Sequence, residues 1–238
     1  MTTRIAMWSG PRNLSTAMMY AFAARGDCTV SDEPFYAASL AQTPDPHPMQ
    51  DQILASQEND PARVALTGSQ PTPIWYQKHM THHMLPAMPT AWMKTCRHAF
   101  LIRHPARVVA SYARKRESPT LDDLGFLQQR RLFDPRGEDT GAAPPVIDST
   151  DIRANPGPML DALCRSLDIP YTPTMLEWTA GPKPYDGIWA PVWYHAVHQS
   201  TGFDAAEGPL PTLSPDDQAL ADAAMPAYAA LKAYALSV

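Results

Sequence analysis

Short apolar segments, each ending at a turn and most followed by a helical pattern, constrain the fold of this chain more than any other feature. Continuous apolar runs of this kind are typical of strands that are buried on both faces. Their alternation with helices predicts an α/β fold in three layers, with a central, mainly parallel sheet flanked by helices. The predicted strands are residues 4–8, 28–30, 74–78, 99–102 and 146–148.

Helical patterns lie between these strands and after the last one. Residues 15–24 are rich in Ala and Met, and either Asn13 or Ser15 is available as the N-cap of that helix. Later helices carry apolar residues at helical spacing and begin at proline, which suits the first turn of a helix. These helices are expected over residues 105–116, from Asn155-Pro156 onward and from Ser214-Pro215 onward.

Two long stretches lack a strand signal. Residues 35–70 are expected to be helical and polar, broken by several prolines, whereas residues 117–145 are expected to form loops. Both stretches are predicted to shape the substrate-binding region. Because no Gly/Ser-rich linker or charge run divides the 238 residues, the chain 1–238 is predicted to be a single domain.

Composition excludes several classes of function. The formal net charge of −5 argues against general binding to nucleic acid or to an anionic membrane. No apolar run approaches the roughly 20 residues that span a bilayer, and the first residues lack the apolar core of a signal peptide. The cysteines are widely spaced, without the Cys/His spacing of a zinc site. A cytoplasmic protein with no metal, no nucleic-acid partner and no membrane partner is therefore expected.

A polar loop joins the first strand to its helix and is a candidate phosphate site. The start of a helix presents free backbone amides and the positive end of the helix dipole, both of which favour an anion. Gly10 permits a tight turn, Arg12 offers a forked set of donors, and Ser15 and Thr16 add hydroxyl groups. An ordinary capped turn between strand and helix is the alternative interpretation.

The loop resembles the 5′-phosphosulfate loop of the sulfotransferase superfamily, commonly PKSGT or PRSGT. This chain has Asn13-Leu14 where the common form has Ser-Gly and where the triphosphate pattern GxxxxGK[ST] needs Gly-Lys. The resemblance implies a P-loop-like fold and the donor 3′-phosphoadenosine 5′-phosphosulfate (PAPS), with adenosine 3′,5′-bisphosphate (PAP) as product. The donor-binding residues that it implies here are Gly10, Pro11, Arg12, Asn13, Leu14, Ser15 and Thr16.

A second candidate anion site follows the fourth strand. Arg103 ends this strand and can form paired hydrogen bonds with a phosphate group. The segment resembles the family's 3′-phosphate segment, in which a serine follows the arginine eight residues later; here that serine is Ser111. Arg107 and Ser111 share a helix face, which by itself is somewhat more typical of a solvated basic face than of a binding site. Together the two segments favour a donor with a 3′-phosphate over ATP.

Two further strand ends offer acid–base residues. Glu33 follows the second strand, as a glutamate base does in some bacterial members of the family, and Asp32 is its near alternative. Lys78 ends the third strand and is similar to the lysine that assists the leaving group in many cytosolic members. Those members also carry a catalytic histidine nearby. The candidate histidines of this chain are His79, His82 and His83.

The same residues have structural interpretations that stay open. Glu33 can act as an N-cap or pair with Arg12, and a single buried histidine is more often structural than catalytic. Late in the chain, Lys183 is similar in place to a basic segment that closes over the 3′-phosphate in sulfotransferases. Trp189, Trp193 and Tyr194 can line an acceptor pocket or simply pack on the core.

Three functions are compatible with these features. The first is a sulfotransferase that moves a sulfuryl group from PAPS to a hydroxyl or amine of a small molecule, without a metal. The second is a nucleotide-dependent kinase on a P-loop scaffold, and the third is a nucleotide-binding protein without turnover. Fold alone does not separate them, and the sequence does not indicate the acceptor or the oligomeric state.

Overall fold

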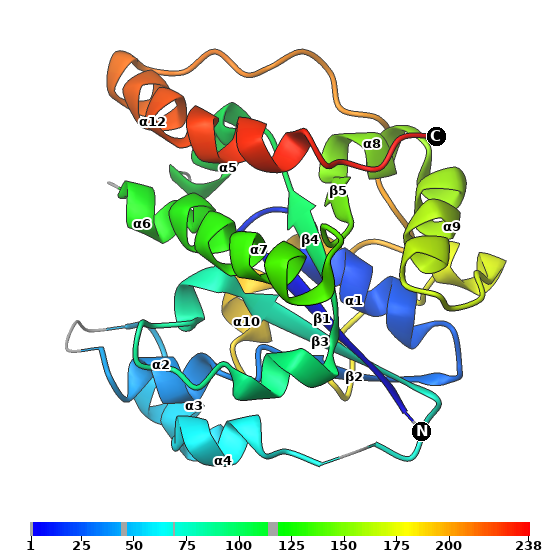
Figure 1. Cartoon of the computed structure of the whole chain (residues 1–238). Helices are drawn as coiled ribbons and strands as arrows, with labels where there is room; N and C mark the ends of the chain where they lie inside the picture. Colours follow the sequence, from blue (N-terminus) through cyan, green and yellow to red (C-terminus); the bar gives the residue numbers. More distant parts are fainter. Residues whose placement is uncertain (1, 44–46, 69, 114–118) are drawn as a thin grey trace.

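A parallel sheet runs through the centre of the protein in a computed structural model that describes residues 2–43, 47–68, 70–113 and 119–238 (Figure 1). Within these residues the sheet has five strands in the order β2-β3-β1-β4-β5, and every neighbouring pair is parallel. The predicted α/β fold is confirmed. The strands are β1 (Thr3–Ser9), β2 (Cys28–Asp32), β3 (Ile74–Met80), β4 (Arg97–Ile102) and β5 (Val146–Asp148).

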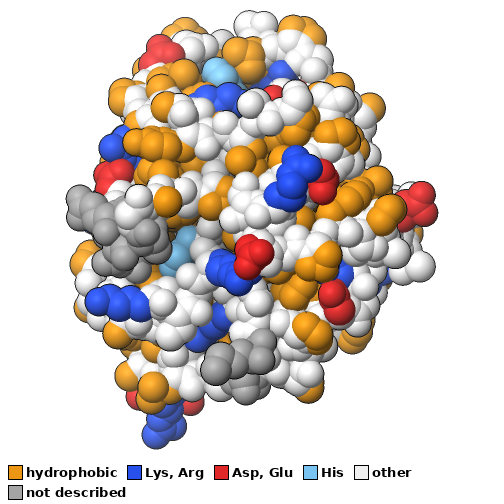
Figure 2. All heavy atoms as spheres, turned by 45° about the vertical axis from the view of Figure 1, so that its right-hand side comes forward, with side chains coloured by type: hydrophobic (Ala, Val, Ile, Leu, Met, Phe, Trp, Pro, Cys, Tyr) orange, Lys and Arg blue, Asp and Glu red, His pale blue; other side chains and the backbone are white. Residues whose placement is uncertain are grey.

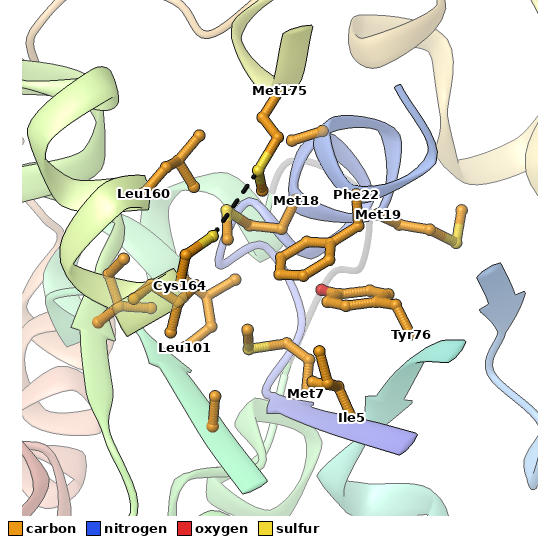
Figure 3. Packing of buried hydrophobic residues seen from close by; sticks show 14 of the residues in the cluster. Ile5, Met7, Met18, Met19, Phe22, Tyr76, Leu101, Leu160, Cys164 and Met175 are labelled. Carbon is orange, nitrogen blue, oxygen red and sulfur yellow. Dashed lines mark hydrogen bonds between the residues drawn. The ribbon is translucent and has the colours of Figure 1, made fainter. Parts of the chain in front are cut away.

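One face of the sheet is covered by α1 (Ser15–Ala23) and α9 (Pro156–Ser166). Successive side chains of a strand point to opposite faces, and Ile5 and Met7 of β1 point to this one. Figure 3 shows how Phe22 of α1 stacks on Tyr76 of β3, with ring centroids 4.2 Å apart. Because β1 is buried from Ile5 to Ser9, the loop that follows it starts from a well-packed strand end.

The opposite face is covered by α5 (Pro105–Ala113), α7 (Phe126–Thr140) and α12 (Pro215–Lys232). Ala6 and Trp8 of β1 point to this second core. Ser214 caps α12 by accepting a hydrogen bond from the Asp217 amide at 3.2 Å, as expected for a Ser-Pro helix start. The two cores make the sheet the middle of three layers, in agreement with the prediction.

A small third cluster lies at the β2 edge of the sheet. It contains residues of α2 (Tyr36–Leu40), α3 (Gln50–Ser56) and α10 (Ala190–Trp193), which are far apart in sequence. The late segment around α10 is thereby brought beside the end of β2. The remaining elements are α4 (Pro61–Ala65), η1 (Thr81–His83), η2 (Ala91–Thr95), α6 (Leu121–Leu124), α8 (Ser149–Ala154), η3 (Pro173–Leu176) and α11 (His195–His198).

Two local predictions are wrong, and one extends beyond the described residues. Residues 117–145 were expected to be loops, but α6 and α7 occupy much of this stretch, and Thr120 starts α6 with a full capping box. Neither Asn13 nor Ser15 caps α1: Leu14 is its N-cap residue, and the Asn13 side chain instead donates to the Leu101 carbonyl at 3.2 Å. The expected continuation of α5 to residue 116 lies outside the described residues.

The surface mixes charges of both signs. On the face shown in Figure 2, Lys and Arg side chains lie among acidic, hydrophobic and uncharged ones. Among the residues that the structure describes, no helix combines the length and the apolar character needed to cross a bilayer.

Candidate active site

Polar residues that follow the strands gather at one edge of the sheet. The strand register places Asp32 beside Lys78, Ser9 beside Leu101, and Ile102 beside Asp148. In parallel sheets, ligands bind outside the carboxyl ends of the strands. The residues after these ends are therefore neighbours around one candidate site.

The loop after β1 has an unusual backbone. Arg12 and Leu14 both have positive φ angles, 63° and 77°, in the left-handed region that favours glycine. Leu14 stands where the common 5′-phosphosulfate loop has glycine, and it keeps that conformation. A left-handed non-glycine residue costs on the order of 1–3 kcal/mol and persists only where the surroundings hold it.

Close packing holds this loop in place. A Cβ atom at Gly10 would lie 2.7 Å from the Leu124 carbonyl oxygen, and one at Gly125 would lie 2.9 Å from the Thr81 hydroxyl oxygen and 3.3 Å from the Gly10 Cα atom. The Thr81 hydroxyl donates to the Gly125 carbonyl at 3.0 Å. The corner between α6 and α7 therefore packs directly against the loop after β1. A side chain at either glycine would clash with its neighbours.

The start of α1 offers hydrogen-bond donors to an anion. Leu14, at the N-cap, has no side-chain oxygen with which to bind the first amides of the helix. Ser15 and Thr16 carry hydroxyl groups in the first turn. Amides, hydroxyls and the positive end of the helix dipole together suit a phosphate or sulfate group.

Arg103 links this loop to the end of β4. Its guanidinium donates to the Arg12 carbonyl oxygen at 2.8 Å, although the two residues are 91 positions apart. The two segments that the sequence marked as anion sites therefore meet. Ser111 lies on α5, partly exposed, one helical turn beyond Arg107.

A carboxylate lies where Arg103 was expected to bind a phosphate. Arg103 forms a short ion pair with Glu207, and Arg107 Nε and Arg153 Nη1 each lie 3.1 Å from a Glu207 oxygen. The Thr150 hydroxyl donates to Glu207 at 3.0 Å. We call Arg103, Arg107, Arg153 and Thr150 the arginine pocket.

A second charged group, the acid–lysine cluster, lies at the ends of β2 and β3. It consists of Asp32, Glu33, Lys78 and Tyr194. Lys78 Nζ donates to Asp32 Oδ1 at 2.8 Å, to the Tyr194 hydroxyl at 2.6 Å and to Glu33 through a short hydrogen bond. Their side chains are buried, with Lys78 1% exposed and Glu33 9% exposed.

The late aromatic segment completes this cluster. The Tyr194 hydroxyl donates to Asp32 Oδ2 at 2.7 Å, and the Trp189 indole donates to the Tyr194 oxygen at 3.0 Å. The Gly187 amide also donates to Asp32, at 2.9 Å. Tyr194 and Trp189 were expected either to line an acceptor pocket or to pack on the core; both are buried in the third cluster, and the Tyr194 hydroxyl also bonds to the charged centre.

The charge balance of the cluster shifts the pKa of its members. Burial raises the pKa of Glu33 to about 7, opposed by the positive charge of Lys78 and reinforced by Asp32. Burial disfavours the ammonium of Lys78, but Asp32 and Glu33 outweigh that effect and raise its pKa. Because burial disfavours its charged form and Asp32 adds to this effect, Glu33 can exchange a proton near neutral pH.

The histidines occupy three different environments. His79 points into the second core, stacked on Trp8 with ring centroids 4.6 Å apart, which favours a structural role. His83 stacks on Tyr36 and has Nδ1 3.8 Å from Glu33 Oε2, so it borders the acid–lysine cluster. His82 packs edge-on against His83.

Burial makes all three histidines neutral at ordinary pH. It lowers the pKa of His82 to about 4 and the pKa of His79 and His83 well below the usual value. Among the described residues, His79 Nε2, His82 Nδ1 and His83 Nδ1 have no hydrogen-bond partner.

The Lys183 side chain is bound within its own late segment and packs over a ring of α1. Its ammonium donates to the Thr179 carbonyl and hydroxyl oxygens at 2.6 and 2.8 Å and lies over the Tyr20 ring. Asp186, nearby, accepts from the Lys183 amide and the Tyr20 hydroxyl. These bonds fix the loop that carries Gly187 toward Asp32.

Several residues of the site were not identified from sequence. Thr150 lies two residues after the end of β5, so the same strand-end argument would have found it, whereas Arg153 lies near the end of α8. Glu207 gave no such signal, because it lies in an irregular segment between Gly202 and α12. Within the described part of the chain, no group of three or more His, Cys, Asp or Glu side chains is arranged to hold a metal ion.

Comparison with solved structures supports this fold. The chain is similar to the sulfotransferase domain from the curacin biosynthetic pathway, with a TM-score of 0.55 and 16% identity, over 94% of this chain and 97% of that one. It is also similar to the sulfotransferase domain from the Synechococcus PCC 7002 olefin synthase, with a TM-score of 0.53 and 15% identity, over 93% and 94% of the two chains. At these identities the likeness concerns the fold.

Two proteins that are similar in sequence carry names of another kind. Branched-chain-amino-acid aminotransferase-like proteins 1 and 2 of Arabidopsis thaliana are 35% and 36% identical to this chain, over 97% and 85% of its length. The matches cover 42% and 36% of those two proteins, so this chain spans less than half the length of either. The match does not extend to the remainder of either protein.

A family model extends over nearly the whole chain. The sulfotransferase domain model matches residues 3–235, a range that includes the loop after β1, the acid–lysine cluster and the arginine pocket. Since the match covers far more than half of the sequence, the chain belongs to the sulfotransferase domain family.

Proposed function

We propose that this protein transfers a sulfuryl group from PAPS to a hydroxyl or amine of a small-molecule acceptor. One observation carries the proposal: the Arg103 guanidinium donates to the Arg12 carbonyl at 2.8 Å, so the two anion-binding segments adjoin. A donor with phosphate groups at both its 5′ and 3′ positions suits two adjoining anion sites. In this scheme the 5′-phosphosulfate binds the loop from Gly10 to Thr16, and the 3′-phosphate binds near Arg103.

The acid–lysine cluster supplies a base. Glu33 is buried beside Lys78, and its pKa of about 7 lets the carboxylate accept a proton at neutral pH. As the acceptor oxygen or nitrogen bonds to sulfur, the bond from sulfur to the bridging phosphate oxygen breaks. Glu33 takes the acceptor's proton, and adenosine 3′,5′-bisphosphate departs with the electron pair of the broken bond.

Other residues of the cluster have positioning roles in this scheme. Lys78 and Tyr194 fix the Glu33 and Asp32 carboxyl groups, and Lys78 also places positive charge near the leaving group. His83 borders Glu33 and provides a neutral imidazole on the acceptor side. The proposed transfer uses these side chains and the loop amides, without a metal.

Donor selectivity tests the proposal. We expect isothermal titration to show binding of adenosine 3′,5′-bisphosphate at least about tenfold tighter than ATP, with that preference lost in Arg103→Ala. Arg97→Ala is the matched control, because Arg97 begins β4 and binds the Leu167 carbonyl at the opposite end of the strand. Equal binding of ATP would favour the kinase alternative.

Turnover separates an enzyme from a binding protein. Incubation with PAPS and a panel of alcohols, phenols and amines is expected to release adenosine 3′,5′-bisphosphate in step with a sulfated product. Tight bisphosphate binding without product for any acceptor of the panel would favour a nucleotide-binding protein that has lost catalysis.

A further inference from the structure

One carboxylate of an exposed segment is inserted deep into the arginine pocket. Residues 203–213 form neither helix nor strand, and most of them are exposed, including Leu210 at 51%. The Glu207 side chain is nevertheless 2% exposed. Such a contrast indicates that Glu207 is held by its charge partners and not by a folded element around it.

The arginines hold the segment as well as the carboxylate. Arg153 Nε donates to the Ala205 carbonyl at 2.9 Å, and Arg107 forms a short hydrogen bond with the Gly208 carbonyl. Arg103 is bound on its other side by the Arg12 carbonyl. The pocket is therefore continuous with the loop after β1 through a single guanidinium.

Positive charge is in excess in this pocket. Three guanidinium groups face one buried carboxylate. Asp204, 3.6 Å from Arg153, is exposed. Asp148, which accepts from the Thr150 amide, is paired with Lys232 at 3.0 Å. A guanidinium keeps its charge in proteins, and its planar fork matches phosphate as well as carboxylate. A phosphate monoester has a second negative charge and a third terminal oxygen, so it suits these donors better than Glu207 does.

We infer that Arg107, Arg153 and Thr150 complete the 3′-phosphate site with Arg103, and that Glu207 is a resident carboxylate which the donor's 3′-phosphate displaces. The inference rests on the proposed function for the identity of the donor. In the absence of donor, Glu207 neutralises the pocket. When donor binds, residues 203–213 leave it, and the same arginines exchange one anion for another.

Two variants test this exchange by isothermal titration. Glu207→Gln keeps the shape of the side chain but removes its charge, and we expect it to bind adenosine 3′,5′-bisphosphate at least about tenfold tighter than the wild type. Arg153→Ala is expected to bind it at least about tenfold more weakly. Glu177→Gln is the matched control, since Glu177 is exposed and lies outside the pocket. Adenosine 5′-monophosphate, which lacks the 3′-phosphate, should bind wild type and Glu207→Gln alike.

The outcomes distinguish this inference from the proposed function. If the bisphosphate binds wild type and Glu207→Gln equally, the donor assignment stands and the displacement is wrong. If the bisphosphate binds no variant but inorganic phosphate raises the melting temperature of Glu207→Gln and not of Glu177→Gln, the pocket is a phosphate site and the donor assignment is wrong. If neither the bisphosphate nor inorganic phosphate binds, both the displacement and the donor assignment are wrong.

Hydrogen exchange of the wild-type protein gives an independent test that needs no variant to fold. Saturating adenosine 3′,5′-bisphosphate is expected to accelerate amide exchange in residues 203–210, because the segment loses its arginine contacts. At the same time it should slow exchange at the start of α1. Slower or unchanged exchange in residues 203–210 would overturn the displacement.

Discussion

The acid–lysine cluster and the arginine pocket lie at the same edge of the sheet but carry opposite excess charge. In the first, two carboxyl groups share one ammonium; in the second, three guanidinium groups share one carboxylate. A carboxyl group can remove excess negative charge by taking up a proton. The pKa of Glu33, raised by burial to about 7, favours this uptake. A guanidinium cannot release one, so the arginine pocket must be neutralised by an anion.

This difference predicts different behaviour of the two clusters. The acid–lysine cluster is assembled from strand ends and from a segment fixed by the Trp189 and Gly187 hydrogen bonds. Its members should therefore be important for stability as well as for proton transfer. The anion of the arginine pocket comes from an irregular segment, so it should be exchangeable at low cost to the fold.

The largest effect is expected from Lys78→Met. Removing the ammonium leaves two buried carboxyl groups facing each other without a cation, which should lower the free energy of unfolding by about 3–5 kcal/mol. Urea denaturation measures this loss. Lys232→Met is the matched control: Lys232 also contacts two carboxylates, Asp148 and Asp151, but it is 37% exposed and should cost about 1 kcal/mol or less. If both variants lose similar free energy of unfolding, burial of the acid–lysine cluster does not make its ammonium important for stability.

Glu33→Gln is expected to reduce the transfer rate by about 10²-fold or more, because the amide cannot accept the acceptor's proton. Wild-type activity should rise with pH through about 7 as Glu33 ionises. The measurement is the pH profile of kcat/KM from single-acceptor assays. A variant that retains its rate, or a profile without a rise near pH 7, would point instead to His83 as base.

The same carboxyl group has a signature in stability. Between its ordinary pKa of 4.5 and about 7, folded Glu33 holds a proton that the unfolded chain has released. The contribution of this group to stability therefore falls as pH rises through that window, and Glu33→Gln should remove that contribution. Urea denaturation of both proteins at pH 5.5 and pH 8 tests this sign.

Tyr194→Phe is expected to lower the free energy of unfolding by about 1–3 kcal/mol. The variant leaves the Asp32 carboxylate, the Lys78 ammonium and the Trp189 indole each short of one buried hydrogen-bond partner. Tyr185→Phe is the control, since the half-buried Tyr185 ring packs edge-on against Tyr20 outside this cluster. Equal effects of the two substitutions would show that Tyr194 acts through packing alone.

Glu207→Gln should have a smaller effect on stability than Lys78→Met. The amide oxygen of Gln can still accept hydrogen bonds from the arginines, and their side chains are 14–20% exposed, whereas the Lys78 side chain is 1% exposed. Chemical denaturation beside Glu177→Gln measures it. If Glu207→Gln lowers the free energy of unfolding as much as Lys78→Met does, Glu207 is needed for the fold. The proposed displacement of Glu207 by a phosphate would then be wrong.

The central sheet and its flanking helices could be predicted from the sequence, because strands buried on both faces are continuously apolar. The sequence also identified polar residues at the strand ends, such as Lys78 and Arg103, as candidate site residues. Helix α7 was not predicted, because its polar sequence contains proline and glycine, which are both typical of loops. The partners of the strand-end residues depend on long-range packing: Tyr194 and Glu207 are 162 and 104 positions from Asp32 and Arg103.

Leu14 illustrates the limit of motif matching. The family loop is recognised by a glycine, and this chain lacks it, yet the left-handed backbone is present with φ of 77°. The surrounding contacts, and not the residue type, maintain the shape of the loop. A search for the glycine alone would have missed the site.

The contact between Gly10 and Gly125 has a consequence for protein engineering. Because the loop after β1 and the corner before α7 touch without side chains between them, neither can move independently of the other. A larger side chain at position 125 should therefore displace the loop after β1 as well as the corner itself. Substitution of an exposed residue of α7 such as Leu127 should leave the loop in place, so α7 can be redesigned from its outer surface but not from its first residues.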